Sequence, residues 1–438
     1  MWGTATAALQ IEGSLRSDGA GESSWEHFSR QPGAISDNTT PEVGCDHYRL
    51  WRDDISRMKD LGVKAYRFSV PWCRTVPDGK TLNPAALDFY DRLVDELLAK
   101  GIEPYVTLFH WETPQALEER GGWLNKDTAY AIEKHAESTL RRLADRVGHF
   151  FTINEAMCFS LLGYGSGVHA PGLKLGNKAA LQSLHNAYLA HGVLLDVIRK
   201  TAPQVKAGIV ENTVTAIPVW ESPEHCAAAE RAFDDLNADR LTLVLQGRYS
   251  DAFLKRVGAD APDFTDAELK LIGGKMDMIG LNCYSGCHVA DAPELPEQYR
   301  VIPFPADYPR MTWDWFGYDP NSLYWSIREI NALYPGYEFF ITENGCPGTD
   351  RPDRDSGRID DTTRVLFLRE YLKSAYRATA EGLPLKGYFC WSLLDNFEWA
   401  FGYTTRFGLY YVDWPSQRRI AKLSAGYFRE VVRQNALV

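Results

Sequence analysis

The sequence predicts an α/β fold, a single domain over residues 1–438 built as a closed (β/α)8 TIM barrel with extended loops after its strands. The chain holds eight short apolar runs, and helical patterns lie between them. The runs are nearly continuous, as expected of strands covered on both faces in a parallel sheet. Eight such units favour a closed barrel over an open sheet. The predicted strands are residues 2–10, 63–70, 103–110, 149–155, 206–212, 277–284, 338–343 and 386–392.

Two units show most clearly the repeated order of helix, glycine and strand. Apolar residues recur at helical spacing over residues 48–61, a glycine ends that helix, and the strand-like run 65–70 follows. In the next unit, Asn83 is expected to cap a helix whose apolar face runs over residues 87–98. Gly101 then ends this helix before the third strand.

Two connecting regions are unusually long. Residues 285–320 are rich in Pro, Asp and aromatic residues, and residues 393–418 are also loop-like. They follow strands six and eight, so a barrel would place both on the face where its active site lies.

Composition excludes several kinds of partner. Lys and Arg total 47 against 58 Asp and Glu, which gives a net charge of −11. The sequence contains no run of basic residues that could bind nucleic acid. No apolar stretch approaches the roughly 18 residues of a membrane span. The eight cysteines are scattered, with no Cys-x-x-Cys pair or zinc spacing, and the start lacks the features of a signal peptide. These features predict reduced thiols and a cytoplasmic protein, and nothing specifies an oligomeric state.

Polar or aromatic residues end nearly every predicted strand. In a barrel the carboxyl ends of the strands surround the active site, so we expect these side chains to converge on one bowl. They are Gln10, Arg67, His110, Asn154 with Glu155, Asn212, Asn282 with Tyr284, Glu343, and Trp391.

Two of these positions carry carboxylates. Glu155 follows strand four and Glu343 follows strand seven, two strands expected to lie across the barrel from each other. Glycoside hydrolysis requires such a pair, one acid to protonate the leaving oxygen and one carboxylate to attack the anomeric carbon.

Other chemistries lack support in the sequence. Only His110 falls at a strand end, and one imidazole does not make a metal site. No Gly-x-Gly-x-x-Gly follows a strand, and no phosphate loop or serine nucleophile elbow is present. We therefore predict neither a metal nor a cofactor.

Eight short motifs in a fixed order connect the chain to a known family, and most stand at predicted strand ends. They are 2–13, 66–69, 108–114, 152–155, 282–284, 341–345, 391–399 and 407–413. On these motifs the sequence resembles glycoside hydrolase family 1, the retaining β-glucosidase family, over nearly its whole length.

The resemblance implies catalytic roles. Glu343 resembles the nucleophile and Glu155 the acid/base, while Arg67 and Tyr284 match residues that keep the nucleophile ionised and oriented. A retaining enzyme would hold the two carboxyl groups about 5–5.5 Å apart.

The resemblance also implies a shell that binds the sugar. Gln10, His110, Asn154, Glu398 and Trp399 match residues that bind hydroxyl groups, with Gln10 and His110 as donors, Glu398 as an acceptor and Asn154 at the 2-hydroxyl. Trp391 matches the ring beneath the sugar, Asn282 a polar residue near the nucleophile, and Phe407 an aromatic near the 6-hydroxyl.

The function implied is a retaining exo-β-glycosidase, with terminal β-D-glucosyl residues of small β-glycosides or short oligosaccharides as the leading substrate. Galactoside or fucoside cleavage and transglycosylation stay open. The presence of both glutamates disfavours a non-catalytic glycan-binding protein, Glu155 disfavours a thioglycosidase, and Glu398 disfavours a 6-phosphoglycosidase. Trp111 and Trp315 are either platforms for the aglycone or packing residues.

Four positions depart from the family pattern, one of them Pro347, which is unusual two residues after Gly345. Ala156 stands where the family usually has proline, while Leu9 and Cys283 stand where aromatic residues are common. None of these differences removes a predicted catalytic group.

Overall fold

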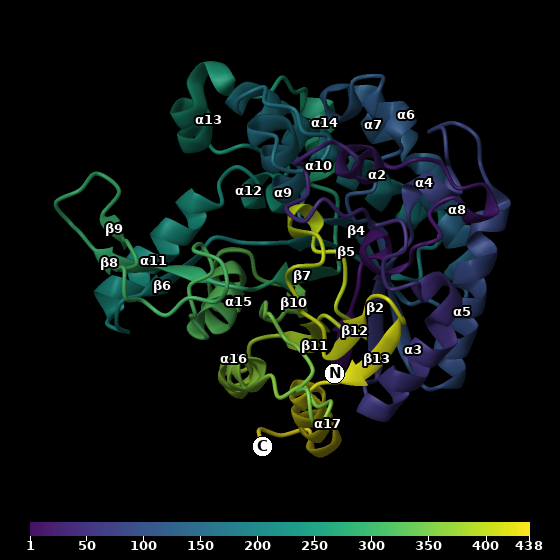
Figure 1. The fold of residues 1–438 in the computed structure, drawn as a ribbon. Helices are drawn as coiled ribbons and strands as arrows, with labels where there is room; N and C mark the ends of the chain where they lie inside the picture. Colours follow the sequence, from purple (N-terminus) through teal and green to yellow (C-terminus); the bar gives the residue numbers. More distant parts are fainter.

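The computed structural model describes residues 1–438 as a closed barrel of eight parallel strands, surrounded by helices (Figure 1). The predicted fold is therefore confirmed. In order around the ring, the strands are β1 (Trp2–Ala5), β11 (Leu385–Trp391), β10 (Glu338–Asn344), β7 (Met278–Asn282), β5 (Lys206–Glu211), β4 (His149–Asn154), β3 (Glu103–Phe109) and β2 (Ala65–Ser69).

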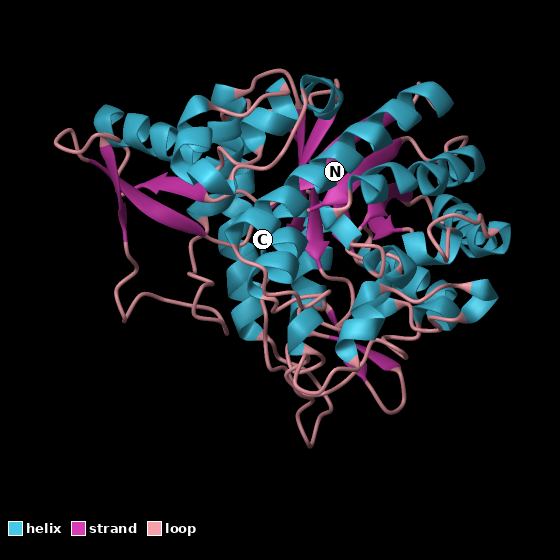
Figure 2. Ribbon diagram, turned by 90° about the horizontal axis from the view of Figure 1, so that it is seen from above, coloured by secondary structure: helices cyan, strands magenta, loops and turns pink.

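Helices pack around the strands, as the view from above shows (Figure 2). Those of ten or more residues are α3 (His47–Leu61), α5 (Leu87–Ala99), α8 (Glu133–Leu143), α10 (Asn177–Thr201), α11 (Pro223–Leu236), α15 (Asn321–Leu333), α16 (Thr362–Ala380) and α17 (Leu423–Gln434). The shorter ones are α1 (Ala8–Ile11), α2 (Ser24–Ser29), α4 (Trp72–Thr75), α6 (Gln115–Glu118), α7 (Lys126–Ala131), α9 (Ala156–Ser160), α12 (Leu241–Gln246), α13 (Asp251–Val257) and α14 (Asp266–Ile272). None of the helices combines the length and apolar character needed to cross a membrane.

The unit of α5 and β3 shows how sequence pattern becomes structure. The apolar face of α5 is buried against the barrel, and Gly101, with φ of 72°, adopts the left-handed conformation that ends the helix. Asn83 does not cap as predicted. Its side-chain amide instead donates to the carbonyls of Asp18 and Arg74, which fixes the loop before the helix.

The first strand is shorter than predicted. It ends at Ala5, and the buried residues Ala8–Ile11 form the short helix α1. A continuous apolar run does not distinguish a buried strand from a buried helix, and Ala, Leu and Gln favour helix. The Ala8 N–H donates to Ser69 Oγ at 2.8 Å, which ties the start of α1 to the end of β2.

The two long connections contain more structure than the sequence indicated. Residues 285–320 include β8 (Gly286–Asp291) and β9 (Tyr299–Ile302), which join β6 (Thr215–Pro218) in a three-stranded sheet that projects from the barrel (Figure 1). After β11, the chain forms the hairpin of β12 (Tyr410–Asp413) and β13 (Arg418–Ala421). These strands have four to six residues and most include a charged side chain, so they lack the long continuous apolar run of a barrel strand.

The barrel is closed by its first and last strands. β1 pairs with β2 on one side and with β11 on the other, and Ala5 lies opposite both Arg67 and Trp391. The Met1 amino group donates to Lys386 O at 2.9 Å at the start of this pairing. The opposite end of the same strands carries the candidate site.

Candidate active site

Glu343 lies near the end of β10, and two residues from other parts of the barrel contact its carboxylate. Arg67 Nη1 donates to Glu343 Oε1 at 2.7 Å, and the Tyr284 hydroxyl donates to Oε2 at 2.8 Å. Arg67 is fully buried and also donates to Asn154 Oδ1 at 2.6 Å. Arg67 lies in the middle of β2 rather than at its end as expected, and its long side chain reaches from there to the Glu343 carboxylate.

Glu155 directly follows β4, at a sharp turn into α9. Its φ of 45° lies in the left-handed region, a strained conformation for a residue other than glycine. Its backbone N–H donates to Val210 O at 2.9 Å, and its Oε1 accepts a hydrogen bond from Asn282 Nδ2 at 2.9 Å. The turn and the amide together hold the carboxyl in the mouth of the barrel.

The strands that carry the two glutamates are not opposite each other, which corrects our expectation. β4 and β10 lie three positions apart in the ring, with β5 and β7 between them. Asn282, at the end of β7, contacts Glu155 on one side, and its Oδ1 accepts from Thr342 Oγ1 on the other at 2.7 Å. One amide therefore links the segments that carry both acids.

The surroundings of the two carboxyl groups separate their acidities. Burial, and then the negative charge of Glu343, raise the pKa of Glu155 to about 8. Burial also raises the pKa of Glu343, but the Arg67 cation and the hydrogen bonds from Arg67 and Tyr284 oppose that shift. Glu343 has an ion pair at 2.7 Å, whereas the closest donor to Glu155 is an amide. Glu343 therefore releases its proton first.

A group of aromatic and polar side chains lies beside the acids. The His110 ring is nearly parallel to the rings of Trp391 and Trp399, with centroids about 6 Å away. Asn154 Nδ2 lies 3.3 Å from His110 Nε2, and burial lowers the pKa of His110 well below its usual range. The imidazole is therefore neutral, accepts from Asn154 through Nε2, and carries its proton on Nδ1.

Three buried polar atoms around this group have no partner within the protein. They are Gln10 Oε1, His110 Nδ1 and Glu398 Oε2. Buried polar groups are normally hydrogen-bonded, so three unpartnered ones beside two acids indicate a polar, hydroxyl-rich ligand. Burial raises the pKa of Glu398 to about 8, and the charges of Glu343 and Glu155 add to this shift.

Gln10 presents the opposite end of its amide to that predicted. Its Nε2 donates to Asn396 Oδ1 at 3.1 Å and to Phe397 O at 2.9 Å. Both hydrogen bonds lie within the protein, so the side chain offers an acceptor rather than a donor to a ligand.

Of the remaining predicted residues, Phe407 packs edge-on against Tyr284 at 6.3 Å. Trp111 is only 6% exposed and donates through Nε1 to Asn154 O at 2.8 Å, so it is a packing residue and not a platform at the surface. Trp315, in contrast, is 58% exposed. It stacks on Trp313 at 5.5 Å, and Trp313 lies 5.5 Å from Phe407.

Sequence reasoning missed Glu211, a third buried carboxyl close to Glu155. It is the last residue of β5, is 1% exposed, and has no hydrogen-bond partner on either oxygen. Burial raises its pKa to about 8, and the charge of Glu155 contributes to the shift. A polar residue at the end of an apolar strand is the signal for Glu211, and the next residue, Asn212, carries the same signal.

We expect Glu211→Gln to stabilise the protein at pH 8 and to have little effect at pH 4.5. Between these values the unfolded chain releases the Glu211 proton while the folded protein keeps it, so rising pH costs stability, by about 1.4 kcal/mol per unit of pKa difference. Glutamine does not titrate, so the gain in Tm should grow by several degrees across this window. Calorimetric Tm values of both proteins at several pH values test this, and a gain independent of pH would contradict it.

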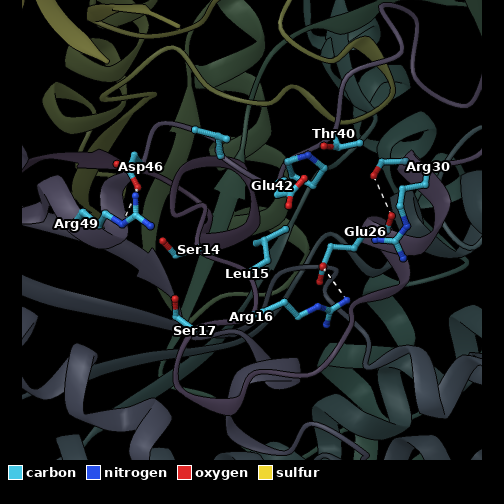
Figure 3. Close-up of a pocket in the computed structure, with 13 residues that line it drawn as sticks. Ser14, Leu15, Arg16, Ser17, Glu26, Arg30, Thr40, Glu42, Asp46 and Arg49 are labelled. Carbon is cyan, nitrogen blue, oxygen red and sulfur yellow. Dashed lines mark hydrogen bonds and ion pairs between the residues drawn. The ribbon is translucent and has the colours of Figure 1, made fainter. Parts of the chain in front are cut away.

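A surface cavity of about 650 Å³ is separate from this site (Figure 3). It is lined by loops around residues 14–17 and 40–43 and by polar side chains such as Arg16 and Glu26, and no predicted site residue lines it. Its arginines face carboxylates, as in the Arg16–Glu26 pair at 3.1 Å. No group of three or more His, Cys, Asp or Glu side chains is arranged to hold a metal ion.

A (β/α)8 barrel whose mouth holds two buried glutamates of different acidity, beside three unpartnered buried polar atoms, defines a glycoside hydrolase. The family model described as glycosyl hydrolase family 1 matches residues 1–437. The chain therefore belongs to glycosyl hydrolase family 1.

Individual relatives agree over the full length. The chain is 40% identical to beta-glucosidase A of Thermotoga maritima, over 100% of this chain and 97% of the relative. It is 38% identical to a bifunctional beta-D-glucosidase/beta-D-fucosidase of Bifidobacterium breve, over 100% and 98%. A solved structure of the family 1 β-glucosidase from Thermotoga maritima matches with a TM-score of 0.91 at 38% identity, covering 100% and 98% of the two chains. Another shows the Thermotoga maritima β-glucosidase in complex with deoxynojirimycin, with a TM-score of 0.90 at 38% identity and the same coverage.

Proposed function

We propose that the protein is a retaining exo-β-glycosidase that removes terminal non-reducing β-D-glucosyl residues from small β-glycosides or short oligosaccharides. The observation that carries this proposal is the unequal environment of the two glutamates. Glu343 is paired with a cation and a phenol, whereas Glu155 has a raised pKa and stays protonated near neutral pH. The relatives named as β-glucosidases support glucose as the sugar.

The two glutamates divide the reaction into two displacements. In the first, the Glu343 carboxylate attacks the anomeric carbon while Glu155 protonates the departing oxygen, which gives a covalent glycosyl-enzyme. Esterified Glu343 no longer carries a charge, so Glu155 ionises more readily. In the second, Glu155 accepts a proton from water as that water attacks the same carbon and Glu343 leaves. The two inversions together retain the configuration of the sugar.

The residues around the acids bind and orient the sugar. The unpartnered atoms of Gln10, His110 and Glu398 supply contacts to hydroxyl groups, and the Trp391 ring packs against the sugar face. Asn154 accepts a hydrogen bond from Arg67, which also binds the nucleophile, and it directly precedes the acid/base Glu155. We assign Asn154 to the 2-hydroxyl of the sugar. Phe407 borders the pocket on the side of Tyr284.

We expect kcat/KM to fall on the alkaline side with an apparent pKa near 8. Activity requires protonated Glu155, so it is retained below the pKa of this group and lost as pH rises through it. The acid limb reports protonation of Glu343. Initial rates at low substrate concentration across pH 4–10 measure both limbs, and an activity that keeps rising above pH 9 would exclude Glu155 as the acid.

A panel of aryl β-glycosides tests the proposed function. We expect hydrolysis of the β-glucoside, with release of β-glucose as the first product by NMR. The Bifidobacterium breve relative, named for both glucosidase and fucosidase activity, supports the β-fucoside as a second substrate. If no member of the panel is cleaved, the proposal is refuted.

Trp315 is proposed as a platform for the aglycone. It is exposed and connects through Trp313 to Phe407 at the edge of the sugar pocket. We expect Trp315→Ala to raise KM for aryl β-glucosides several-fold through lost stacking, which is worth about 0.5–1.5 kcal/mol. The inhibition constant of deoxynojirimycin, which has no aglycone, should not change, and an equal change in both constants would contradict the assignment.

We also propose a cytoplasmic location. All eight cysteines are unpaired, as expected in a reducing compartment. Cell fractionation tests this, and recovery of the native protein outside the cytoplasm would overturn it.

A further inference from the structure

Asp395 lies at the neck of the loop that carries three of the sugar-binding residues. The chain leaves β11 at Trp391, presents Glu398 and Trp399, and returns through Phe407. Backbone hydrogen bonds tie the two ends of this loop together, from Ser392 N to Phe407 O at 3.2 Å, from Leu409 N to Ser392 O at 2.9 Å, and from Asp395 N to Tyr410 O at 3.0 Å.

The Asp395 carboxylate joins both sides of this neck. Its Oδ1 accepts from Gly408 N at 3.0 Å and from Lys422 Nζ at 2.6 Å, and its Oδ2 accepts from Arg406 Nη1 at 2.7 Å. Its side chain is completely buried. Gly408 is required here, because a Cβ at this position would lie 2.0 Å from the Asp395 backbone nitrogen. One carboxylate thus binds the returning strand through the amides of Gly408 and Val412 and the Arg406 guanidinium, and it also binds Lys422 beyond that strand.

The charges around the neck are balanced. Lys422 also contacts Asp350 at 2.6 Å, and Arg364 contacts Asp350 at 2.8 Å and pairs with Asp361. With Asp395 and Arg406 the cluster holds three carboxylates and three cations. A buried cluster of this kind is weak support for stability by itself, but removal of one member leaves an unpaired charge and changes the local geometry.

The contacts of the neck reach the sugar pocket through neighbouring residues. Asn396, next to Asp395, accepts from Gln10 Nε2, and Phe397 N donates to Gln10 O at 3.1 Å. Glu398 follows directly, with its own N–H donating to Gly402 O at 2.7 Å. A shift of the neck would therefore move Glu398 and Gln10 together, although Asp395 touches neither acid.

We infer that Asp395 is a positioning residue for sugar binding. It acts by fixing the loop of Glu398, Trp399 and Phe407 against the barrel. This role rests on the proposed function. Small displacements of binding groups have large effects, since a misplacement of about 1 Å can cost roughly 10²-fold in rate.

The test compares Asp395→Asn with Asp350→Asn. Both substitutions remove one carboxylate from the same cluster and one partner from Lys422, but only Asp395 accepts from the backbone of the loop. We expect both variants to lose Tm. Only Asp395→Asn should raise the dissociation constant of deoxynojirimycin and KM for an aryl β-glucoside, by at least about tenfold.

The double variant Asp395→Asn/Lys422→Met separates the effect on loop position from the effect on stability. It also provides the test if the single variant does not fold. It restores the balance of charge, so we expect Tm to recover in part while the dissociation constant stays raised. A wild-type dissociation constant in the folded Asp395 variants, or an equal rise in Asp350→Asn, would overturn the inference. If the wild type neither cleaves the glucoside nor binds deoxynojirimycin, the proposed function itself fails.

Discussion

Replacement of Glu343 with alanine is expected to lower kcat for an aryl β-glucoside by roughly 10⁴- to 10⁶-fold, the scale seen when an enzyme loses a group that acts covalently. No other carboxylate contacts both Arg67 and Tyr284, so no neighbouring residue can take over the attack. The loss should appear in kcat rather than in KM. Steady-state kinetics with several substrates measure it.

A small external nucleophile distinguishes a nucleophile from a merely electrostatic role. In Glu343→Gly, azide can enter the space left by the side chain and attack the anomeric carbon, which displaces the aryl group and yields an α-glycosyl azide. A single displacement inverts the anomeric carbon once, where the normal reaction inverts it twice, so the product has the α configuration. NMR identifies this product. Glu329→Gln, at a buried glutamate on α15 outside the site, is the control and should keep full activity. Activity near the wild-type level in Glu343→Ala would refute the assignment.

Replacement of Glu155 with alanine is expected to lower kcat/KM by about 10²- to 10⁴-fold for substrates with poor leaving groups, the usual contribution of general acid catalysis. Substrates with a very acidic phenol need no protonation, so their first step should be nearly unaffected. Their kcat should still fall, because the second step lacks its base. Pre-steady-state kinetics should then show a burst of phenol.

The pH dependence supplies a second readout for Glu155. The alkaline limb expected near pH 8 is assigned to this carboxyl, so it should disappear in the alanine variant. Ala156→Gly, at the neighbouring position of α9, provides a control for local disturbance and should keep the limb. An unchanged pH profile in Glu155→Ala, or an equal loss for all leaving groups, would contradict the assignment.

The fold was predictable because its strongest signals are local. The apolar runs of the barrel strands and the helical stripe of α5 repeat within short windows, and each window indicates its own element. The start of the chain was one exception, since residues 8–11 form α1 although they continue an apolar run. Whether such a segment is strand or helix depends on what it packs against, which no short window contains.

Much of the candidate site was also suggested by sequence, because strand ends converge in a barrel. Glu155, Asn282 and Glu343 lie where that rule placed them. The direction of the Gln10 amide was not predictable, since its partners Asn396 and Phe397 are more than 380 residues away. The role inferred for Asp395 depends on contacts with Arg406, Gly408 and Lys422, which lie 11, 13 and 27 residues further along the chain and are brought together only by the fold.

Closure of the barrel by β1 and β11 has a consequence for the protein's synthesis. The first strand leaves the ribosome with β2 as its only available neighbour, and its other edge gains a partner only after residue 391 has been made. An unpaired edge is prone to association with other chains, and contacts between such distant residues form slowly. Growing chains are therefore expected to depend on chaperones until the final strand is inserted.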